Sequence, residues 1–204
     1  METGGPAAHK RAGVKKPDWP AAPAPHPAYP GKADQVLELI EEFRQHPPGV
    51  VVKAVVADAL YGTQRFLDEA SRQCGEVQAI SQLRSHQKVR FRGREWSLAE
   101  YFRAYPGVPM RLCVRGGEEI EAEVSSARLH VCAHGKKRFV VALKYPGETD
   151  DSFLVATDLS WRTLDIARTY TLRWLAEVFS RTGSSTQDGG KWPNSQTKRG
   201  QAEA

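Results

Sequence analysis

The stretch Val50-Val51-Val52-Lys53-Ala54-Val55-Val56-Ala57 decides the fold, and Asp58 follows it directly. Apart from Lys53, every residue of this run is apolar. A nearly continuous β-branched run predicts a strand that is covered on both faces, as in the sheet of an α/β protein. Catalytic and binding groups of open α/β sheets gather at the carboxyl ends of the strands. Asp58 is therefore the first candidate functional residue.

Helices are expected on both sides of this strand. An apolar stripe predicts a first helix with Asp34 as its N-cap, ending before Pro47. A second helix is expected from Thr63 to about Gln73 and is followed by a strand at 76–81. This order of helix, strand, helix and strand supports an α/β core.

A basic, strand-rich segment comes next. Between Glu76 and Tyr145 the sequence carries thirteen Lys and Arg against seven Asp and Glu, whereas the whole chain has a net charge of +5. Strands are predicted at 88–92, 110–114, 119–124, 127–133 and 138–144, and a capping box at Ser97 and Glu100 opens a short helix. The charge excess suits a polyanion, most simply nucleic acid, although a merely soluble basic surface is the alternative.

The last predicted elements are a buried strand at 153–157 and a helix from about 161 to 179, capped by Asp158 or Ser160. Tyr170, Arg173 and Glu177 are spaced i, i+3 and i+7, so they share one face of that helix. A phenol, a guanidinium and a carboxylate on one stripe could bind a metal and a phosphate together. The plainer alternative is a solvated face with an Arg–Glu pair.

Other kinds of site receive less support. His130, Cys132 and His134 alternate on a predicted strand, where the outer pair lies roughly 13 Å apart, too far to share one zinc ion. The GxSxG, HExxH, P-loop and GxGxxG motifs are absent. Three cysteines without CxxC spacing, and an N-terminus without an apolar run, predict a reducing, cytoplasmic setting.

Three segments carry a resemblance to a known family. Tyr170-x2-Arg173-x3-Glu177 matches the first three members of the Y-(2)-R-(3)-E-(6)-K signature of bacterial insertion-sequence DDE transposases. Residues 55–62 resemble the second-aspartate segment of that family, and residues 154–160 resemble the strand leading into its glutamate helix. The resemblance implies an α/β fold with a partial RNase H-like core, interrupted by an antiparallel β-rich insertion.

The chain is accordingly divided into five parts. These are a Pro-rich tail predicted to be disordered (1–33), the first part of the core (34–83), the β-rich insertion (84–150), the final core strand with the glutamate helix (151–180), and a second disordered tail (181–204).

The function that the resemblance implies is DNA transposition, by metal-dependent strand cleavage and transfer at insertion-sequence ends. Asp58 and Glu177 would be catalytic ligands of Mg²⁺ or Mn²⁺, and Tyr170 and Arg173 would contact phosphate. The basic residues expected to lie against DNA are Arg84, Lys88, Arg90, Arg92 and Arg94. The implied partners are transposon-end DNA and a second copy or a full-length transposase, with no membrane.

Two departures from the family pattern shape this hypothesis. The signature lysine would fall at position 184, which is Ser184, and only Asp18 and Asp34 precede Asp58, where the family carries its first catalytic aspartate. These departures predict a truncated chain that is inactive on its own. The alternative is a non-catalytic transposase remnant that only binds DNA or a full-length partner.

Overall fold

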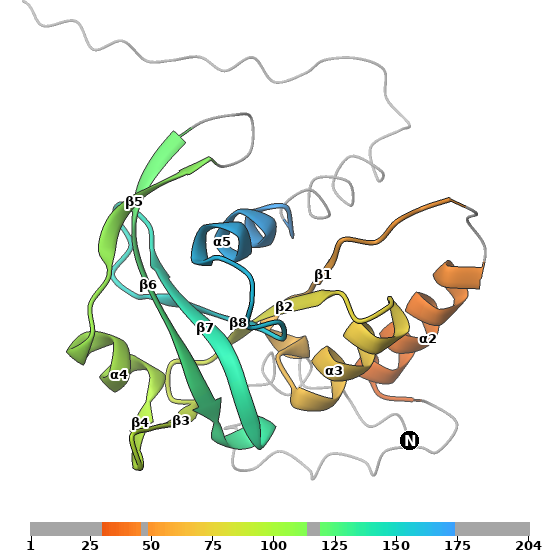
Figure 1. Cartoon of the computed structure of the whole chain (residues 1–204), viewed down its shortest axis with the longest axis horizontal. Coiled ribbons are helices and arrows are strands. Elements are labelled where there is room, and N and C mark those ends of the chain that lie inside the picture. The colour runs from red at the N-terminus through yellow and green to blue at the C-terminus, as the bar shows by residue number, and fades with distance from the viewer. Residues whose placement is uncertain (1–29, 46–48, 114–118, 174–204) are drawn as a thin grey trace, which may run out of the picture.

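A computed structural model of the chain describes residues 30–45, 49–113 and 119–173. These residues form a mixed α/β structure, an open and mostly antiparallel sheet with helices on both of its faces (Figure 1). The strands are β1 (Ala54–Val56), β2 (Gln78–Leu83), β3 (Lys88–Phe91), β4 (Arg94–Ser97), β5 (Val108–Cys113), β6 (Glu119–Val131), β7 (Lys136–Lys144) and β8 (Ser152–Ala156). The helices are α2 (Lys32–Gln45), α3 (Gln64–Gln73), α4 (Leu98–Ala104) and α5 (Thr163–Thr171), with 3₁₀ turns η2 (Ala59–Tyr61) and η4 (Cys132–His134).

The strand order is β1-β2-β8-β7-β6-β3-β4, with β5 paired to the first half of β6. Within the described residues β1 and β2 are parallel, and every other pairing is antiparallel. Strands of the segment 84–150 pair directly with β8, and β8 pairs with β2. The β-rich segment therefore shares one continuous sheet with the strands on either side of it.

Side-chain alternation along the strands builds two separate cores. On β7, Phe139, Val141 and Leu143 pack on the side of α5, whereas Val140 and Ala142 pack on the side of α3 and α4. Both faces of this strand are buried, as its apolar sequence predicts. Helix α2 packs on α3 rather than on the sheet, in a small third cluster around Leu37.

Only the last part of the Val50–Ala57 run forms the strand that was predicted to be covered on both faces. Strand β1 has three residues and lies at the edge of the described sheet, paired only to β2. Val50 and Val51 are 58% and 70% exposed, whereas Val55 and Val56 pack toward opposite faces. The prediction of cover on both faces thus holds only for the last residues of the run, where α3 and α5 reach the strand.

Several predicted elements are confirmed. The helix predicted from Thr63 to about Gln73 is α3, for which Thr63 is the N-cap. The strand predicted at 88–92 is β3, which is joined to β4 by a turn at Arg92 and Gly93, both with positive φ. The capping box is also present, since the Ser97 amide donates to Glu100 Oε2 at 2.7 Å. The strands predicted at 119–124 and 127–133 are instead one strand, β6, because its ladder with β7 continues through the serines between them.

Two predicted helix caps are wrong. Helix α2 begins at Lys32, so Asp34 lies inside its first turn, where it pairs with Arg65 at 2.5 Å. The N-cap of α5 is Arg162, while Asp158 accepts a hydrogen bond from the Ser160 amide at 2.8 Å in the preceding turn. None of the helices in the described ranges has the length and apolarity needed to cross a membrane.

Candidate functional site at the end of strand β1

Asp58 lies two residues beyond β1, exposed to solvent, and forms the N-cap of η2. Its Oδ1 accepts a hydrogen bond from the Ala59 amide at 2.5 Å. Its carbonyl oxygen accepts another from Ser81 Oγ on β2 at 2.7 Å. The Ala57 amide donates to the Ile80 carbonyl at 2.9 Å, so the pairing of β1 with β2 continues up to the residue before Asp58. The backbone of Asp58 is therefore fixed while its carboxylate stays open to solvent.

The turn that follows Asp58 is anchored at Gly62. A Cβ atom at this position would lie 2.2 Å from the Gln82 carbonyl oxygen, so only glycine allows the turn to approach β2 so closely. The Gly62 carbonyl accepts a hydrogen bond from His134 Nε2 at 3.0 Å. Contacts with β2 and η4, which are distant in sequence, thus fix the position of the η2 turn.

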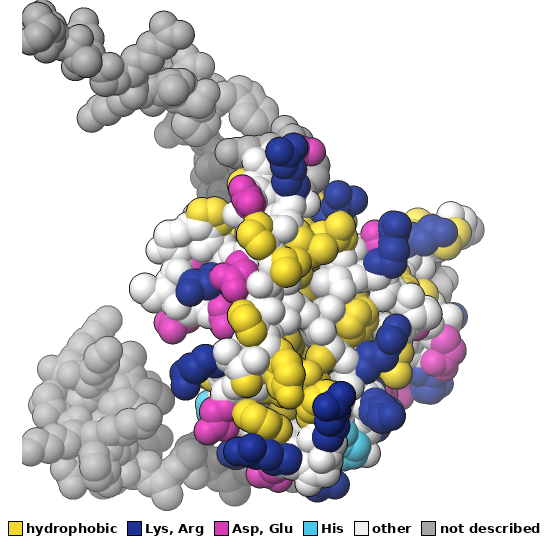
Figure 2. All heavy atoms as spheres, turned by 60° about the vertical axis from the view of Figure 1, so that its left-hand side comes forward, with side chains coloured by type: hydrophobic (Ala, Val, Ile, Leu, Met, Phe, Trp, Pro, Cys, Tyr) yellow, Lys and Arg dark blue, Asp and Glu magenta, His cyan; other side chains and the backbone are white. Residues whose placement is uncertain are grey.

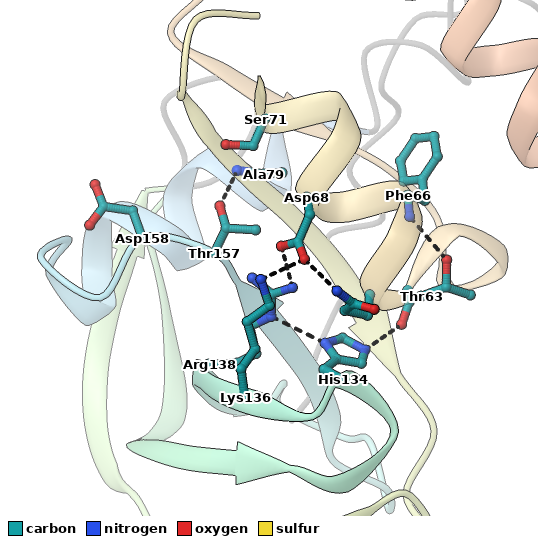
Figure 3. Close-up of polar contacts among 12 residues, drawn as sticks. Thr63, Phe66, Asp68, Ser71, Ala79, His134, Lys136, Arg138, Thr157 and Asp158 are labelled. Atoms are coloured by element: carbon teal, nitrogen blue, oxygen red, sulfur yellow. Dashed lines mark hydrogen bonds and ion pairs between the residues drawn. The ribbon is translucent and has the colours of Figure 1, made fainter. Parts of the chain in front are cut away.

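A buried polar network continues from His134 (Figure 3). Arg138 Nε donates to His134 Nδ1 at 3.2 Å, and Arg138 Nη2 pairs with Asp68 Oδ1 at 2.5 Å. Lys136 Nζ lies 2.6 Å from Asp68 Oδ2. Because Arg138 can only donate and the Gly62 carbonyl can only accept, His134 is the neutral tautomer with its proton on Nε2. The network links α3, β7 and η4 to the turn that carries Asp58.

The pKa shifts in this network follow from burial and charge. Burial lowers the pKa of His134, and the positive charge of Arg138 adds to that effect. Burial alone would raise the pKa of Asp68, but hydrogen bonds from Lys136 and Arg138 outweigh it, and the pKa lies below its usual range. The network is therefore ionised at Asp68 and neutral at His134.

On the other face of the sheet, helix α5 brings Tyr170 to the neighbourhood of Asp58, and Arg173 follows two residues after the helix ends at Thr171. Helix α5 packs against β1 and β2, and Tyr170 is buried with 5% of its surface exposed. The Arg173 guanidinium carbon lies 5.6 Å from the Tyr170 ring centroid. Burial raises the pKa of Tyr170 to about 12; the charge of Arg173 opposes the rise and the charge of Asp58 adds to it. Three candidates distant in sequence thus interact.

Glu177, which was predicted to bind metal together with Asp58, lies outside the described residues. Within those residues, no group of three His, Cys, Asp or Glu side chains is arranged to hold a metal ion. Asp58 does fit the donor chemistry of Mg²⁺, which binds one or two carboxylates together with waters and phosphate oxygens. Arg173 fits phosphate, since its guanidinium presents planar donors to anionic oxygens.

His130, Cys132 and His134 do not share one face as predicted. Strand β6 ends at Val131, and the 3₁₀ turn η4 takes His134 into the buried network. His130 lies on the opposite face of the sheet, in register with Arg90 and Lys137.

The five predicted DNA-contacting residues separate into different groups. Lys88 and Arg90 flank the inward-facing Val89 and are exposed on the α5 side of the sheet. Arg92 and Arg94 instead stack over Phe91 and Trp96, with their guanidinium carbons 5.2 and 4.3 Å from the ring centroids. Arg84 is exposed between β2 and β3. Figure 2 brings the side of β5 and α4 forward and shows a band of hydrophobic side chains with Lys and Arg around it.

The sequence analysis did not single out Asp68 or Arg138, and it considered His134 only as a zinc ligand. One signal for Arg138 was available, because it precedes Val140 by two residues and so points to the same buried face. A cation at such a position needs a buried partner.

Comparison with protein-family models finds no match, and no curated protein matches the chain. What can be inferred about function therefore comes from the residues and their arrangement.

Proposed function

We propose that this chain acts in DNA transposition as a DDE-type polypeptide with an RNase H-like core, serving metal-dependent strand cleavage and transfer at insertion-sequence ends. The observation that carries the proposal is the packing of α5, with Tyr170 buried on it, against β1, whose carboxyl end leads to Asp58, while Arg173 lies beside the Tyr170 ring. The resemblance to the transposase family involves the same residues, since Tyr170 and Arg173 belong to its signature and Asp58 to the second-aspartate segment. The parallel pairing of β1 and β2, with Asp58 just beyond the carboxyl end of β1, also supports the proposal.

Each residue has a role that its surroundings allow. The exposed Asp58 carboxylate would hold Mg²⁺ or Mn²⁺ together with Glu177. When bound, such ions supply an activated water or DNA 3′-hydroxyl and stabilise the leaving oxygen. Arg173 would hold a DNA phosphate near the carboxylate. Tyr170 stays protonated at neutral pH, since its pKa is about 12, but its hydroxyl is buried, so it would support Arg173 through the ring contact instead of meeting phosphate itself.

A second candidate function is DNA binding without cleavage, as a subunit that accompanies an active transposase. The position of Asp34 favours it, because this aspartate lies on α2 in an ion pair with Arg65, not beside Asp58. Asp18, the other aspartate before Asp58, lies outside the described residues.

Incubation of the purified chain with supercoiled plasmid and Mg²⁺ or Mn²⁺ separates the two functions. The chain on its own is predicted to be inactive, because Ser184 stands at the lysine position and no suitable aspartate precedes Asp58. Nicking that Asp58→Ala and Glu177→Ala each abolish would show that the chain is nevertheless catalytic and would support the proposed function. Asp150→Ala is the matched control, since this exposed acid precedes β8 and lies in neither group of candidates. If plasmid is bound but never nicked, the result would support DNA binding without cleavage. Nicking that survives Asp58→Ala would contradict the proposed site.

A further inference from the structure

A line of basic side chains crosses three strands of the sheet. Arg90 of β3 is in register with His130 of β6, and His130 is in register with Lys137 of β7. Because neighbouring strands lie about 4.8 Å apart, the three Cα atoms fall on a straight line of roughly 10 Å. Their side chains share one face of the sheet, since residues in register point to the same side.

Two further cations extend this line. Lys88 precedes Arg90 by two residues, and Arg128 precedes His130 by two, so both point to the same face. Arg128 is held in place: its Nε and Nη2 donate to the Leu159 carbonyl at 3.1 and 2.8 Å, and its guanidinium lies 5.4 Å from the Phe139 ring centroid. We call these five residues the basic sheet face: Lys88, Arg90, Arg128, His130 and Lys137.

The basic sheet face is open to solvent. All four Lys and Arg side chains are exposed, and His130 is half-buried. The face is continuous with the one that α5 covers, because the register runs from Arg128 through Phe139, Ala156 and Ile80 to Val56. Within the described residues, α5 covers the β1 end of this surface and leaves the β3 end uncovered.

The charges on this face are not balanced within the protein. Lys88, Arg90 and Lys137 form no ion pair within ranges 30–45, 49–113 and 119–173. Glu95 is in register with Arg90 and shares this face, so it offsets one of the positive charges. The face therefore presents the four Lys and Arg side chains against this one carboxylate in register.

The chemistry of the face also indicates which part of a nucleic acid it contacts. Of its two aromatic rings, Phe139 is 7% exposed beneath Arg128 and the His130 imidazole is half-buried. The aromatic residues of the β3–β4 hairpin, Phe91 and Trp96, belong to the core on the other side of the sheet. The face therefore offers mainly cations for phosphates and no fully exposed ring for stacking with unpaired bases, which is how single strands are usually held.

From this geometry we propose that the basic sheet face binds the phosphate backbone of double-stranded DNA independently of sequence. The choice of DNA as the polyanion rests on the proposed function, whereas the surface itself follows from register, exposure and charge. The contact is electrostatic, so each phosphate neutralised adds about −0.9 to the slope of log K against log salt concentration.

The test is fluorescence anisotropy of a short labelled DNA duplex titrated with the full chain between about 0.05 and 0.2 M salt. The test variant Arg90→Gln/Lys137→Gln removes two charges from the face. The matched control Arg103→Gln/Arg111→Gln removes two exposed charges from α4 and β5. Circular dichroism and the thermal midpoint establish that both variants are folded.

The test variant should bind on the order of 60-fold more weakly at about 0.1 M salt, with a slope shallower by about 1.8. The control should keep the wild-type slope. Equal losses in the two variants, absence of duplex binding by the wild type, or binding of single strands alone would overturn the proposal. Duplex binding without any cleavage would count against the proposed function while leaving this inference intact.

Discussion

Arg138 Nε donates a hydrogen bond to Nδ1 of His134 at 3.2 Å, and this contact keeps a buried histidine neutral. His134 in turn donates to the Gly62 carbonyl, just beyond the turn that Asp58 opens. The protonation of one imidazole is thereby linked to the position of the candidate site. A proton on Nδ1 would break the Arg138 hydrogen bond and set two cations against each other.

The first prediction concerns acid stability. The pKa of His134 is lower in the folded protein than the value of about 6.5 expected after unfolding, so the unfolded chain binds more protons. The stabilisation is present above about pH 6.5 and is lost as the pH falls toward the folded-state pKa. Urea denaturation at about pH 7.5 and 5.5 should therefore show a lower midpoint in acid.

His134→Gln is the control for this prediction. Glutamine can donate to the Gly62 carbonyl and accept from Arg138, but it does not titrate. Its midpoint should fall less than that of the wild type over the same pH interval. Equal losses in the two proteins would mean that another group causes the acid sensitivity.

The second prediction concerns Asp68, the counter-charge of Arg138. The Arg138 side chain is 3% exposed, so Asp68→Ala leaves a buried guanidinium without its carboxylate. Removing one partner of a buried pair typically costs about 3–5 kcal/mol, and chemical denaturation should show a loss of that order. Glu69→Ala, which breaks the exposed pair with Arg72, should leave the midpoint close to that of the wild type. Similar midpoints for the two variants would contradict a buried role for Asp68.

The elements that the sequence predicted well are those fixed by local chemistry. The capping box at Ser97 and Glu100 and the strand predicted at 138–144, which is part of β7, depend on neighbours a few residues away, and both were predicted from the sequence. The length of β1 was not visible in this way. An apolar run such as Val50–Ala57 cannot show that its strand lies at a sheet edge, where pairing and helix packing reach only its end.

In the candidate site, too, the sequence predicted what local chemistry determines and missed what depends on distant contacts. Asp58 was identified from its place after a strand, and Tyr170 from its spacing to Arg173 on a helix. The support behind Asp58 was missed because it depends on contacts between distant residues, such as His134 with Gly62 and Arg138 with Asp68. No local pattern encodes such contacts.

The third prediction concerns Gly62. Its φ is −72°, so alanine is not excluded by backbone conformation, but the new Cβ would meet the Gln82 carbonyl oxygen at 2.2 Å. Gly62→Ala must move the turn away from β2, at a cost of about 1–3 kcal/mol in the free energy of unfolding. Gly31→Ala is the control, because its Cβ meets only a flexible Asp34 carboxylate oxygen at 3.2 Å. A Gly62→Ala chain as stable as the wild type would show that β2 and the turn are not in close contact.

The fourth prediction tests the contact between Asp58 and Tyr170. The charge of Asp58 helps to raise the pKa of Tyr170 to about 12, so Asp58→Asn should lower that pKa while burial keeps it above 10. Tyrosine ionisation can be followed by NMR, with Tyr170→Phe identifying the signal. Glu148→Gln is the matched control, because Glu148 raises the pKa of Tyr145. It should shift the Tyr145 signal and leave Tyr170 in place. An unchanged Tyr170 titration in Asp58→Asn would separate the two residues and remove the main support for a shared phosphate and metal site.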